Sequence, residues 1–385
     1  MAYELNEDQR QIQDLIRRVA RERVVSRAND IDRTAEYPQD MFDLLKELRL
    51  FTLPFPSEYG GTGSMLSACL AVEELGRACY NTAYLLVVQW TPFGAILAGG
   101  SEEQKRRLLP GLAAGDLRAA ISVTEPQSGS DVAGIRTRAR RVDGGYRLTG
   151  SKAWCTGAPM ADFVLVAAKT GEGNTPGSLN LFLVERGAQG FEVGRKEDKS
   201  GARGIPSCPL FLDDVFVPES NRLGEEGKGF KIVMEAFNTA RPVMGARGVG
   251  LAQGAIDHAI EFVQNRVAFG RTVGDFQGVR WMLADMAMQT EAARQLVYRA
   301  AAMVDAGASG TALAPIAAMA KCFAADTAMR VATDAVQLFG AAGISAESPI
   351  NRYMRDAKVL QIIEGTNQIQ RNIIANSLLG RARSV

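Results

Sequence analysis

Ile362-Ile363-Glu364-Gly365-Thr366-Asn367-Gln368-Ile369-Gln370-Arg371, close to the C-terminus, is the stretch from which the fold is best predicted. It holds one carboxylate, Glu364, after two β-branched apolar residues and before a glycine. Apolar residues with helical spacing and then a glycine follow: Ile369, Ile373, Ile374, Leu378 and Gly380. This pattern predicts a short helix from about Thr366, with Glu364 on a tight turn at its start.

Two roles for Glu364 follow from this position. Loss of hydration against apolar walls would raise the pKa of its carboxyl group and make it a stronger base toward a weak carbon acid. Alternatively, its charge is only favoured by the helix dipole. This segment alone leaves both roles open.

The composition limits the class of protein. The chain has 385 residues, which is enough for two or three domains. Lys and Arg number 44 and Asp and Glu 43, without a long basic run, which argues against nucleic acid as a partner. A hydrophobic fraction of 46% with only 7% aromatic residues is typical of packed helices.

The cysteines and the N-terminus indicate the cellular compartment. The five cysteines are odd in number and form no C-x-x-C pair, so neither a disulfide framework nor a metal site is predicted. The polar, acidic N-terminus does not resemble a signal or transit peptide. We expect no apolar run of the length needed to span a membrane. These features predict a cytoplasmic protein without membrane contact.

Hydrophobic periodicity divides the chain into three domains. Residues 1–118 show the helical period, with helices expected at Glu7–Arg27, Met41–Leu50, Met65–Gly76 and Asn81–Gly99 and from Ser101 to about Leu109-Pro110-Gly111. Residues 119–226 have seven short strand-like runs: 119–123, 138–142, 146–149, 163–168, 179–184, 191–195 and 210–217. Asp143-Gly144-Gly145 is a hairpin signal between two of them. We therefore expect a β-barrel or sandwich inserted between helical domains.

The helical period returns in residues 227–385. Long helices are expected at 230–268, 276–306, 311–339 and 348–363, and Pro242 interrupts the first near its middle. Helices of this length with short connections predict an antiparallel four-helix bundle. The fold class expected is mostly α with an inserted β-domain.

Two motifs in the β-domain point to a binding site. Thr124-Glu125-Pro126 opens a Pro/Gly/Ser turn after a strand, and such a turn exposes N–H groups and hydroxyls to carbonyls or phosphates. Trp154-Cys155-Thr156 sets an indole beside a hydroxyl, which suits a flat aromatic ring. The alternative to a binding role is a purely structural one, in which the first motif is a polar loop and the second places a tryptophan in the barrel core.

Three further motifs lie in the C-terminal helices. Arg266–Arg271 is followed by Phe276-Gln277 and offers guanidinium forks that can bind an oxyanion. Gln337–Ala341 is a second polar and glycine-containing break. Arg241, in a helix predicted to be buried, needs either a ligand phosphate or carbonyl or a nearby carboxylate. His258, the only histidine, is expected to be structural, and no dinucleotide-binding glycine motif or P-loop is present.

In this order the motifs resemble those of the acyl-CoA dehydrogenases over roughly residues 5 to 380. The resemblance implies an FAD enzyme with an N-terminal helical domain, a middle β-domain and a C-terminal four-helix bundle, and it makes Glu364 the catalytic base. It assigns to the cofactor Ile121, Val123, Thr124, Gly129, Ser130, Trp154, Thr156, Arg266, Phe269, Phe276, Gln277, Gln337, Gly340, Thr366 and Gln368. It assigns to the substrate Ser130, Asn238, Arg241 and Gly365.

The resemblance also implies an assembly and a reaction. Arg266 and Gln277 and the Gln337 segment would reach the flavin of a neighbouring subunit, in a homotetramer built as a dimer of dimers. Glu364 would remove the α-proton of an acyl-CoA while the β-hydrogen leaves as hydride to the flavin, giving a trans-2-enoyl-CoA. The thioester carbonyl would be held by the Glu364 N–H and a flavin ribityl hydroxyl. Electrons would then pass to an electron-transfer flavoprotein.

Three departures from the family pattern bear on these expectations. Ala341 replaces a glycine, and Asn238 stands where an acidic residue is usual. Ala240 occupies the position at which some members carry their base, which strengthens Glu364 as the base.

The acyl group is expected to be short, branched or cyclic. Trp90 would shorten the acyl pocket, and Ile363, where many relatives have Tyr, would widen it, although ordinary core packing explains both residues equally well. The alternatives are an acyl-CoA oxidase, a flavin monooxygenase of the same fold or a non-catalytic scaffold.

Overall fold

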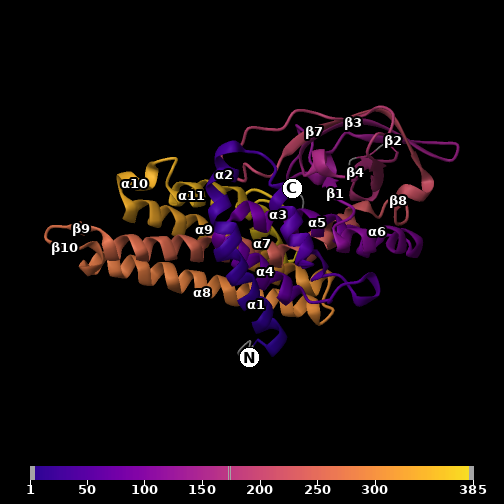
Figure 1. Cartoon of the computed structure of the whole chain (residues 1–385). Helices are drawn as coiled ribbons and strands as arrows, with labels where there is room; N and C mark the ends of the chain where they lie inside the picture. The colour runs from indigo at the N-terminus through magenta and orange to yellow at the C-terminus, as the bar shows by residue number, and fades with distance from the viewer. Residues whose placement is uncertain (1–4, 172, 174, 381–385) are drawn as a thin grey trace.

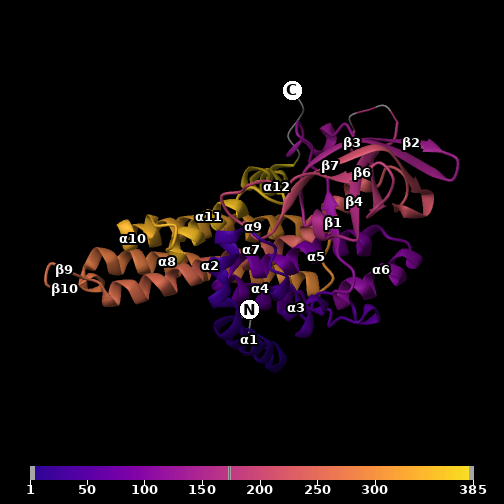
Figure 2. The same cartoon turned by 45° about the horizontal axis from the view of Figure 1, so that its top comes forward.

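The computed structural model describes residues 5–171, 173 and 175–380, and it has the predicted order of a helical domain, a β-domain and a second helical domain. Figure 1 shows the β-domain at one end of an elongated helical body, with the β9–β10 hairpin at the opposite end. The same separation is clear in the second view, in Figure 2. The confirmed fold class is therefore mostly α with a central mixed β-sheet.

The N-terminal domain is helical throughout. Its elements are α1 (Glu7–Val19), a π-helical turn (Ala20–Val24), α2 (Val25–Thr34), α3 (Gln39–Glu47), α4 (Met65–Ala78), α5 (Tyr80–Gly99) and α6 (Glu102–Ala114), with short 3₁₀ turns between α3 and α4. The single helix expected from residue 7 to 27 is thus two helices joined by the π turn. The predicted start of α6 is confirmed, because Ser101 and Gln104 form a reciprocal capping box.

Two further expectations from the sequence were wrong, one for α6 and one for the length of the apolar helices. Helix α6 does not end near Pro110 but continues to Ala114, and its left-handed terminator is Gly115 (φ +72°). Helices α5 and α9 (Gly310–Phe339) are long and apolar enough to cross a membrane, contrary to the reading of the sequence. Most of α5 is buried inside the protein, and it packs on α4, α6 and α7, as a core helix does.

The middle domain forms one mixed sheet of eight strands. The strands are β1 (Ala119–Ser122), β2 (Arg138–Val142), β3 (Gly145–Thr156), β4 (Phe163–Lys169), β5 (Leu179–Glu185), β6 (Phe191–Val193), β7 (Ser207–Pro218) and β8 (Arg222–Leu223). Their order is β6-β7-β3-β2-β4-β5-β8, with β1 parallel to β4. The predicted hairpin is confirmed between β2 and β3. Strand β8 escaped prediction because two residues carry no periodicity.

The sheet has a hydrophobic core separate from that of the helices. Side chains that point into this core, such as those of Tyr146, Phe182 and Leu210, are fully buried. The main core joins both helical domains and includes one face of β1, β4 and β5. The β-domain is therefore anchored on the helices by these three strands.

The C-terminal domain is built around α7 (Gly229–Asn265), which packs on α4, α5, α8 and α9. The other elements are β9 (Val267–Ala268), β10 (Arg271–Thr272), α8 (Gln277–Asp305), α9 (Gly310–Phe339), α10 (Ala341–Ile344), α11 (Pro349–Leu360) and α12 (Asn367–Leu379). Pro242 lies inside α7 without ending it. The predicted start of the last helix is confirmed, since Thr366 is the N-cap of α12.

Close packing of α7 on α4 depends on two glycines. A Cβ atom at Gly250 would overlap the carbonyl group of Glu73, and one at Gly254 would overlap the carbonyl oxygen of Arg77. These contacts are to backbone atoms, which cannot move aside as a flexible side chain can.

We predict that Gly250→Ala lowers the free energy of unfolding by about 1–3 kcal/mol, because the methyl group forces α4 and α7 apart. Gly278→Ala is the matched control, since nothing lies within 4 Å of a Cβ there and the position is in helix α8. The control is expected to be neutral or stabilising by up to about 1 kcal/mol. Thermal denaturation of both variants with excess FAD checks this, and equal melting temperatures for the two would contradict it.

Candidate active site

Glu364 lies on a turn in the left-handed region of backbone conformation, between α11 and α12. Glu364 has φ +52° and Gly365 has φ +87°. Glycine adopts this conformation readily, whereas for glutamate it is uncommon and must be held by the surroundings. The Thr366 hydroxyl accepts a hydrogen bond from the Ile369 N–H (3.3 Å) and so starts α12 directly after the turn.

Two buried side chains hold this turn in place, and sequence reasoning missed both. Lys321 on α9 donates to the Gly365 carbonyl (3.0 Å) and to Asn367 Oδ1 (2.9 Å). Gln370 Nε2 also donates to the Gly365 carbonyl (2.9 Å). The signal for Lys321 was a lone cation within the small apolar run Ala317–Ala325, where a charge needs a fixed partner. Burial lowers the pKa of Lys321 to about 8.

The carboxyl group of Glu364 is held on one side only. Oε1 accepts a hydrogen bond from the Thr91 hydroxyl on α5 (3.3 Å). Oε2 is buried, and the described residues offer it no hydrogen-bond partner. Burial raises the pKa of Glu364 above its ordinary value, against the opposing effects of Arg247, Thr91, Lys321 and Arg241. The raised pKa predicted from the sequence is thereby confirmed, and a carboxylate with one free oxygen is suited to accept a proton.

Arg241 on α7 is buried beside the turn, with only 2% of its surface exposed. It donates to Asn238 Oδ1, a neutral partner, while its Nε has no partner among the residues described. Within the same residues no carboxylate forms an ion pair with it. Burial lowers its pKa to about 10. The nearby carboxylate is that of Glu364, which favours the charged form of Arg241 without an ion pair to it, and a ligand as the second partner stays a prediction.

The Thr124-Glu125-Pro126 loop is shaped by a buried ion pair that sequence reasoning did not find. Lys152, with no exposed surface, contacts Glu125 Oε1 at 2.8 Å. Glu125 also accepts hydrogen bonds from the backbone N–H groups of Arg136 (2.6 Å) and Thr137 (2.9 Å). Burial alone would raise the pKa of Glu125, but Lys152 and these hydrogen bonds outweigh it and lower the pKa to about 2. Glu125 is thus a fixed anion that folds the loop.

Trp154 is not in the core of the β-domain, which was the alternative considered. Its side chain is 56% exposed and its backbone is left-handed (φ +59°). A register shift between Lys152 and Cys155 in the β3–β7 pairing interrupts the alternation of side chains there. The Ala153 N–H donates to the Thr124 carbonyl (2.9 Å), so the two motifs are adjacent.

These residues fit a flat aromatic cofactor. An exposed indole in a strained conformation offers a stacking face, and Thr156 and the Thr124 loop offer hydroxyl and N–H donors beside it. Thr156 also lies close to Ser207, with 3.2 Å between their hydroxyl oxygens. The other predicted cofactor residues nearby differ in exposure. Gly129 and Ser130 in the loop are exposed, Ile121 on β1 is partly exposed, and Val123 is buried.

The remaining predicted cofactor residues lie elsewhere in this chain. Arg266, Phe269, Phe276 and Gln277 surround the β9–β10 hairpin, at the end of the helices opposite the β-domain (Figure 1). Gln337 and Gly340 are at the end of α9. This end contacts α7 through the stacked rings of Phe339 and Phe262, whose centroids are 4.2 Å apart. Phe269 is 96% exposed. One chain therefore does not bring these residues to Glu364, whereas Thr366 and Gln368 directly follow it.

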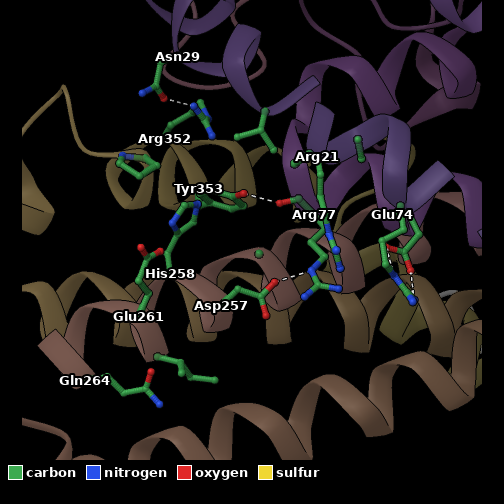
Figure 3. Close-up of a pocket in the computed structure, with 17 residues that line it drawn as sticks. Arg21, Asn29, Glu74, Arg77, Asp257, His258, Glu261, Gln264, Arg352 and Tyr353 are labelled. Atoms are coloured by element: carbon green, nitrogen blue, oxygen red, sulfur yellow. Dashed lines mark hydrogen bonds and ion pairs between the residues drawn. The ribbon is translucent and has the colours of Figure 1, made fainter. Parts of the chain in front are cut away.

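A cavity of about 550 Å³ is lined by the single histidine, His258, and does not include Glu364 (Figure 3). It lies between the N-terminal helices, α7 and α11. Two ion pairs lie in its lining: Arg17 pairs with Glu74 (2.7 Å) and Arg77 with Asp257. His258 packs edge-on against Tyr353. The buried unpaired groups around Glu364 make a better reactive site than these paired ones.

Comparisons with known proteins agree with this geometry. The chain matches the acyl-CoA dehydrogenase N-terminal domain over residues 6–116, the middle domain over 120–215 and the C-terminal domain over 227–379. It is 41% identical to cyclohexane-1-carbonyl-CoA dehydrogenase of Geobacter metallireducens, over 99% of this chain and 100% of the relative.

Solved structures give the same result. Butyryl-CoA dehydrogenase from Megasphaera elsdenii superposes with a TM-score of 0.95 at 38% identity, covering 98% of this chain and 100% of that one. The FAD complex of PigA superposes with a TM-score of 0.92 at 29% identity, covering 99% and 100%. Acyl-CoA dehydrogenases are FAD-dependent oxidoreductases, so the predicted cofactor is confirmed. The chain belongs to the acyl-CoA dehydrogenase family.

Proposed function

We propose that this protein oxidises a short, branched or cyclic acyl-CoA to the trans-2-enoyl-CoA, with Glu364 as the base. The observation that carries the proposal is the buried carboxyl group of Glu364, which has one hydrogen-bonded oxygen and one free oxygen on a constrained turn. A base of raised pKa is closer in proton affinity to the weakly acidic α-carbon of a thioester.

The protein groups around the turn have different roles in the proposed reaction. Glu364 Oε2 takes the α-proton, and Thr91 keeps the carboxylate oriented through Oε1. Bound FAD supplies the acceptor for the β-hydrogen. The buried cations Arg241 and Lys321 favour the negative charge that develops as the proton leaves. Thr124, Trp154 and Thr156 would hold the flavin ring, and Ser130, Asn238, Arg241 and Gly365 would contact the CoA thioester.

The acyl preference rests on partial support. The relative named cyclohexane-1-carbonyl-CoA dehydrogenase supports a cyclic acyl group. Trp90 is buried on α5 and donates to the Phe51 carbonyl (2.9 Å), which supports core packing rather than a role in closing the acyl pocket. Ile363 is partly buried against the main core. The width of the pocket at Ile363 stays a prediction.

The assembly is also proposed. Phe269, Val267 and Trp281 expose apolar surface around the β9–β10 hairpin and the first turns of α8, and large exposed apolar side chains mark interfaces. A neighbouring subunit there would bring Arg266, Gln277 and Gln337 to its flavin, in a homotetramer. The electron-transfer flavoprotein as acceptor and the cytoplasmic location stay predictions.

Glu364→Gln should retain bound FAD and lose acyl-CoA oxidation by about a hundredfold to ten-thousandfold, because glutamine fills the same space and cannot accept the proton. The measurement is anaerobic flavin reduction, followed by absorbance, with Glu58→Gln on the surface as a control. Near-normal reduction by the variant would overturn the assignment of the base.

Thr91→Val should shift the pH dependence of kcat/KM. The base acts only when deprotonated, so activity falls as the pH decreases through the Glu364 pKa. The Thr91 hydrogen bond favours the charged form, and its loss raises this pKa further, which moves the acidic limb to higher pH.

The control is Thr333→Val. Both threonines donate to a carbonyl oxygen one helical turn earlier, Thr91 to Val87 and Thr333 to Met329, but Thr333 is exposed and remote from the site. An acidic limb that stays in place in Thr91→Val, or moves to lower pH, would count against the proposed hydrogen bond to the base.

Phe269→Asp should dissociate the assembly and weaken FAD retention, because it places a charge on the surface proposed to meet a neighbouring subunit. Sedimentation velocity and the flavin-to-protein absorbance ratio measure the two effects. A variant that keeps the wild-type mass and flavin content would show that the hairpin is not part of the interface.

A further inference from the structure

Arg247 on α7 is a buried cation for which the described part of the chain provides no ion pair. It has no exposed surface, and its guanidinium lies over the rings of Tyr84 (3.7 Å) and Tyr80 (4.4 Å). Nη2 is within 3.1 Å of Met244 Sδ, a weak acceptor. Nε and Nη1 have no hydrogen-bond partner among the described residues.

Two half-buried arginines elsewhere in the chain are paired with carboxylates, whereas the buried Arg241 and Arg352 donate to the neutral Asn238 and Asn29. Arg294 contacts Glu73 at 2.8 Å, and Arg355 bonds both oxygens of Asp32. For Arg247, no carboxylate of the described residues lies within ion-pair distance. An unpaired buried guanidinium is costly, and aromatic stacking replaces only part of its lost hydration. The site is therefore incomplete without an anionic or strongly polar ligand.

Arg247 faces the same space as the base. Tyr80, Tyr84 and Thr91 are four and seven residues apart, so they share one face of α5. Thr91 contacts Glu364 at one end of this face, and the two tyrosines contact Arg247 at the other. From Tyr84 to Thr91 the helix rises about 10 Å. Arg247 also opposes the rise of the Glu364 pKa, in keeping with its position against the same face of α5.

The charges and free polar groups of this space favour an anion. Arg241, Arg247 and Lys321 are all buried and all favour the charged form of Glu364, while Asp326 acts on Lys321. The residue that bonds Arg241 is the neutral Asn238. The Tyr80 hydroxyl is buried at the Arg247 end and also has no partner among the described residues. A phenol and a guanidinium side by side form a donor set for a carboxylate.

We infer that the acyl group of the substrate carries a carboxylate at the end away from the thioester, and that Arg247 binds it. This inference rests on the proposed function, because it takes Glu364 to mark the position of the α-carbon. The short distance along α5 matches a short chain or a ring between the thioester and the carboxylate. Arg247 would then determine specificity, while Glu364 performs the proton transfer.

The test compares substrates that differ only in the terminal group. The mono-CoA thioesters of glutaric, adipic and pimelic acids are paired with pentanoyl-, hexanoyl- and heptanoyl-CoA. Each is assayed for flavin reduction with the wild-type holoenzyme and for binding to the Glu364→Gln holoenzyme by calorimetry. We expect the carboxylate member of the best pair to bind and react at least about tenfold better.

Arg247→Gln should remove or invert this preference, and Arg247→Lys should retain part of it. Arg33→Gln, an exposed arginine on α2, is the control and should behave as wild type. An equal loss for both members of a pair in Arg247→Gln would mean that Arg247 acts only on Glu364, which overturns the inference. If the glutamine variant does not fold, the wild-type ratio decides the question alone.

The outcomes separate this inference from the proposed function. Wild-type preference for the methyl-terminated thioesters, or for a hydroxyl-terminated analogue over the dicarboxylic one, contradicts the carboxylate assignment and leaves the dehydrogenase intact. Selective binding of dicarboxylic thioesters without flavin reduction by any of them supports the Arg247 site and contradicts the dehydrogenase.

Discussion

The structure depends on keeping one ionisable carboxyl group, that of Glu364, out of water and in one orientation. Burial makes ionisation less favourable and raises its pKa, while Thr91 fixes one of its oxygens. The left-handed backbone at Glu364 and Gly365 is an uncommon conformation that the surrounding helices must hold. Lys321 and Gln370 do so through the Gly365 carbonyl.

The rest of the chain is arranged around that constraint. Helix α5 supplies the hydroxyl beside the base, α7 supplies the buried arginines and α9 supplies the lysine under the turn. The β-domain places an exposed indole and the Thr124 loop where a flat cofactor can stack, and the Glu125–Lys152 ion pair keeps that loop folded. Helices thus position the acid–base groups, and the sheet positions the cofactor groups.

Much of the fold could be predicted because its signals are local. The long helices and most strands follow from periodicity, and the start of α12 follows from Thr366 and the spacing after it. The end of α6 was mispredicted because Pro110 was read as a stop when Gly115 supplies it. Lys152, which pairs with Glu125, and Lys321, which donates to the Gly365 carbonyl, were missed because both contacts join distant segments. A single sequence does not indicate which residues from distant segments will meet in the folded protein.

The central claim is that a protein carboxylate abstracts the α-proton in the step that reduces the flavin. The most direct measurement is the rate of anaerobic flavin reduction by an acyl-CoA substrate with hydrogen or deuterium at the α-carbon. The account predicts flavin bleaching that is several times slower with α-deuterium. Two results would contradict it. One is flavin that no acyl-CoA bleaches. The other is bleaching at the same rate with either isotope when the chemical step limits the rate.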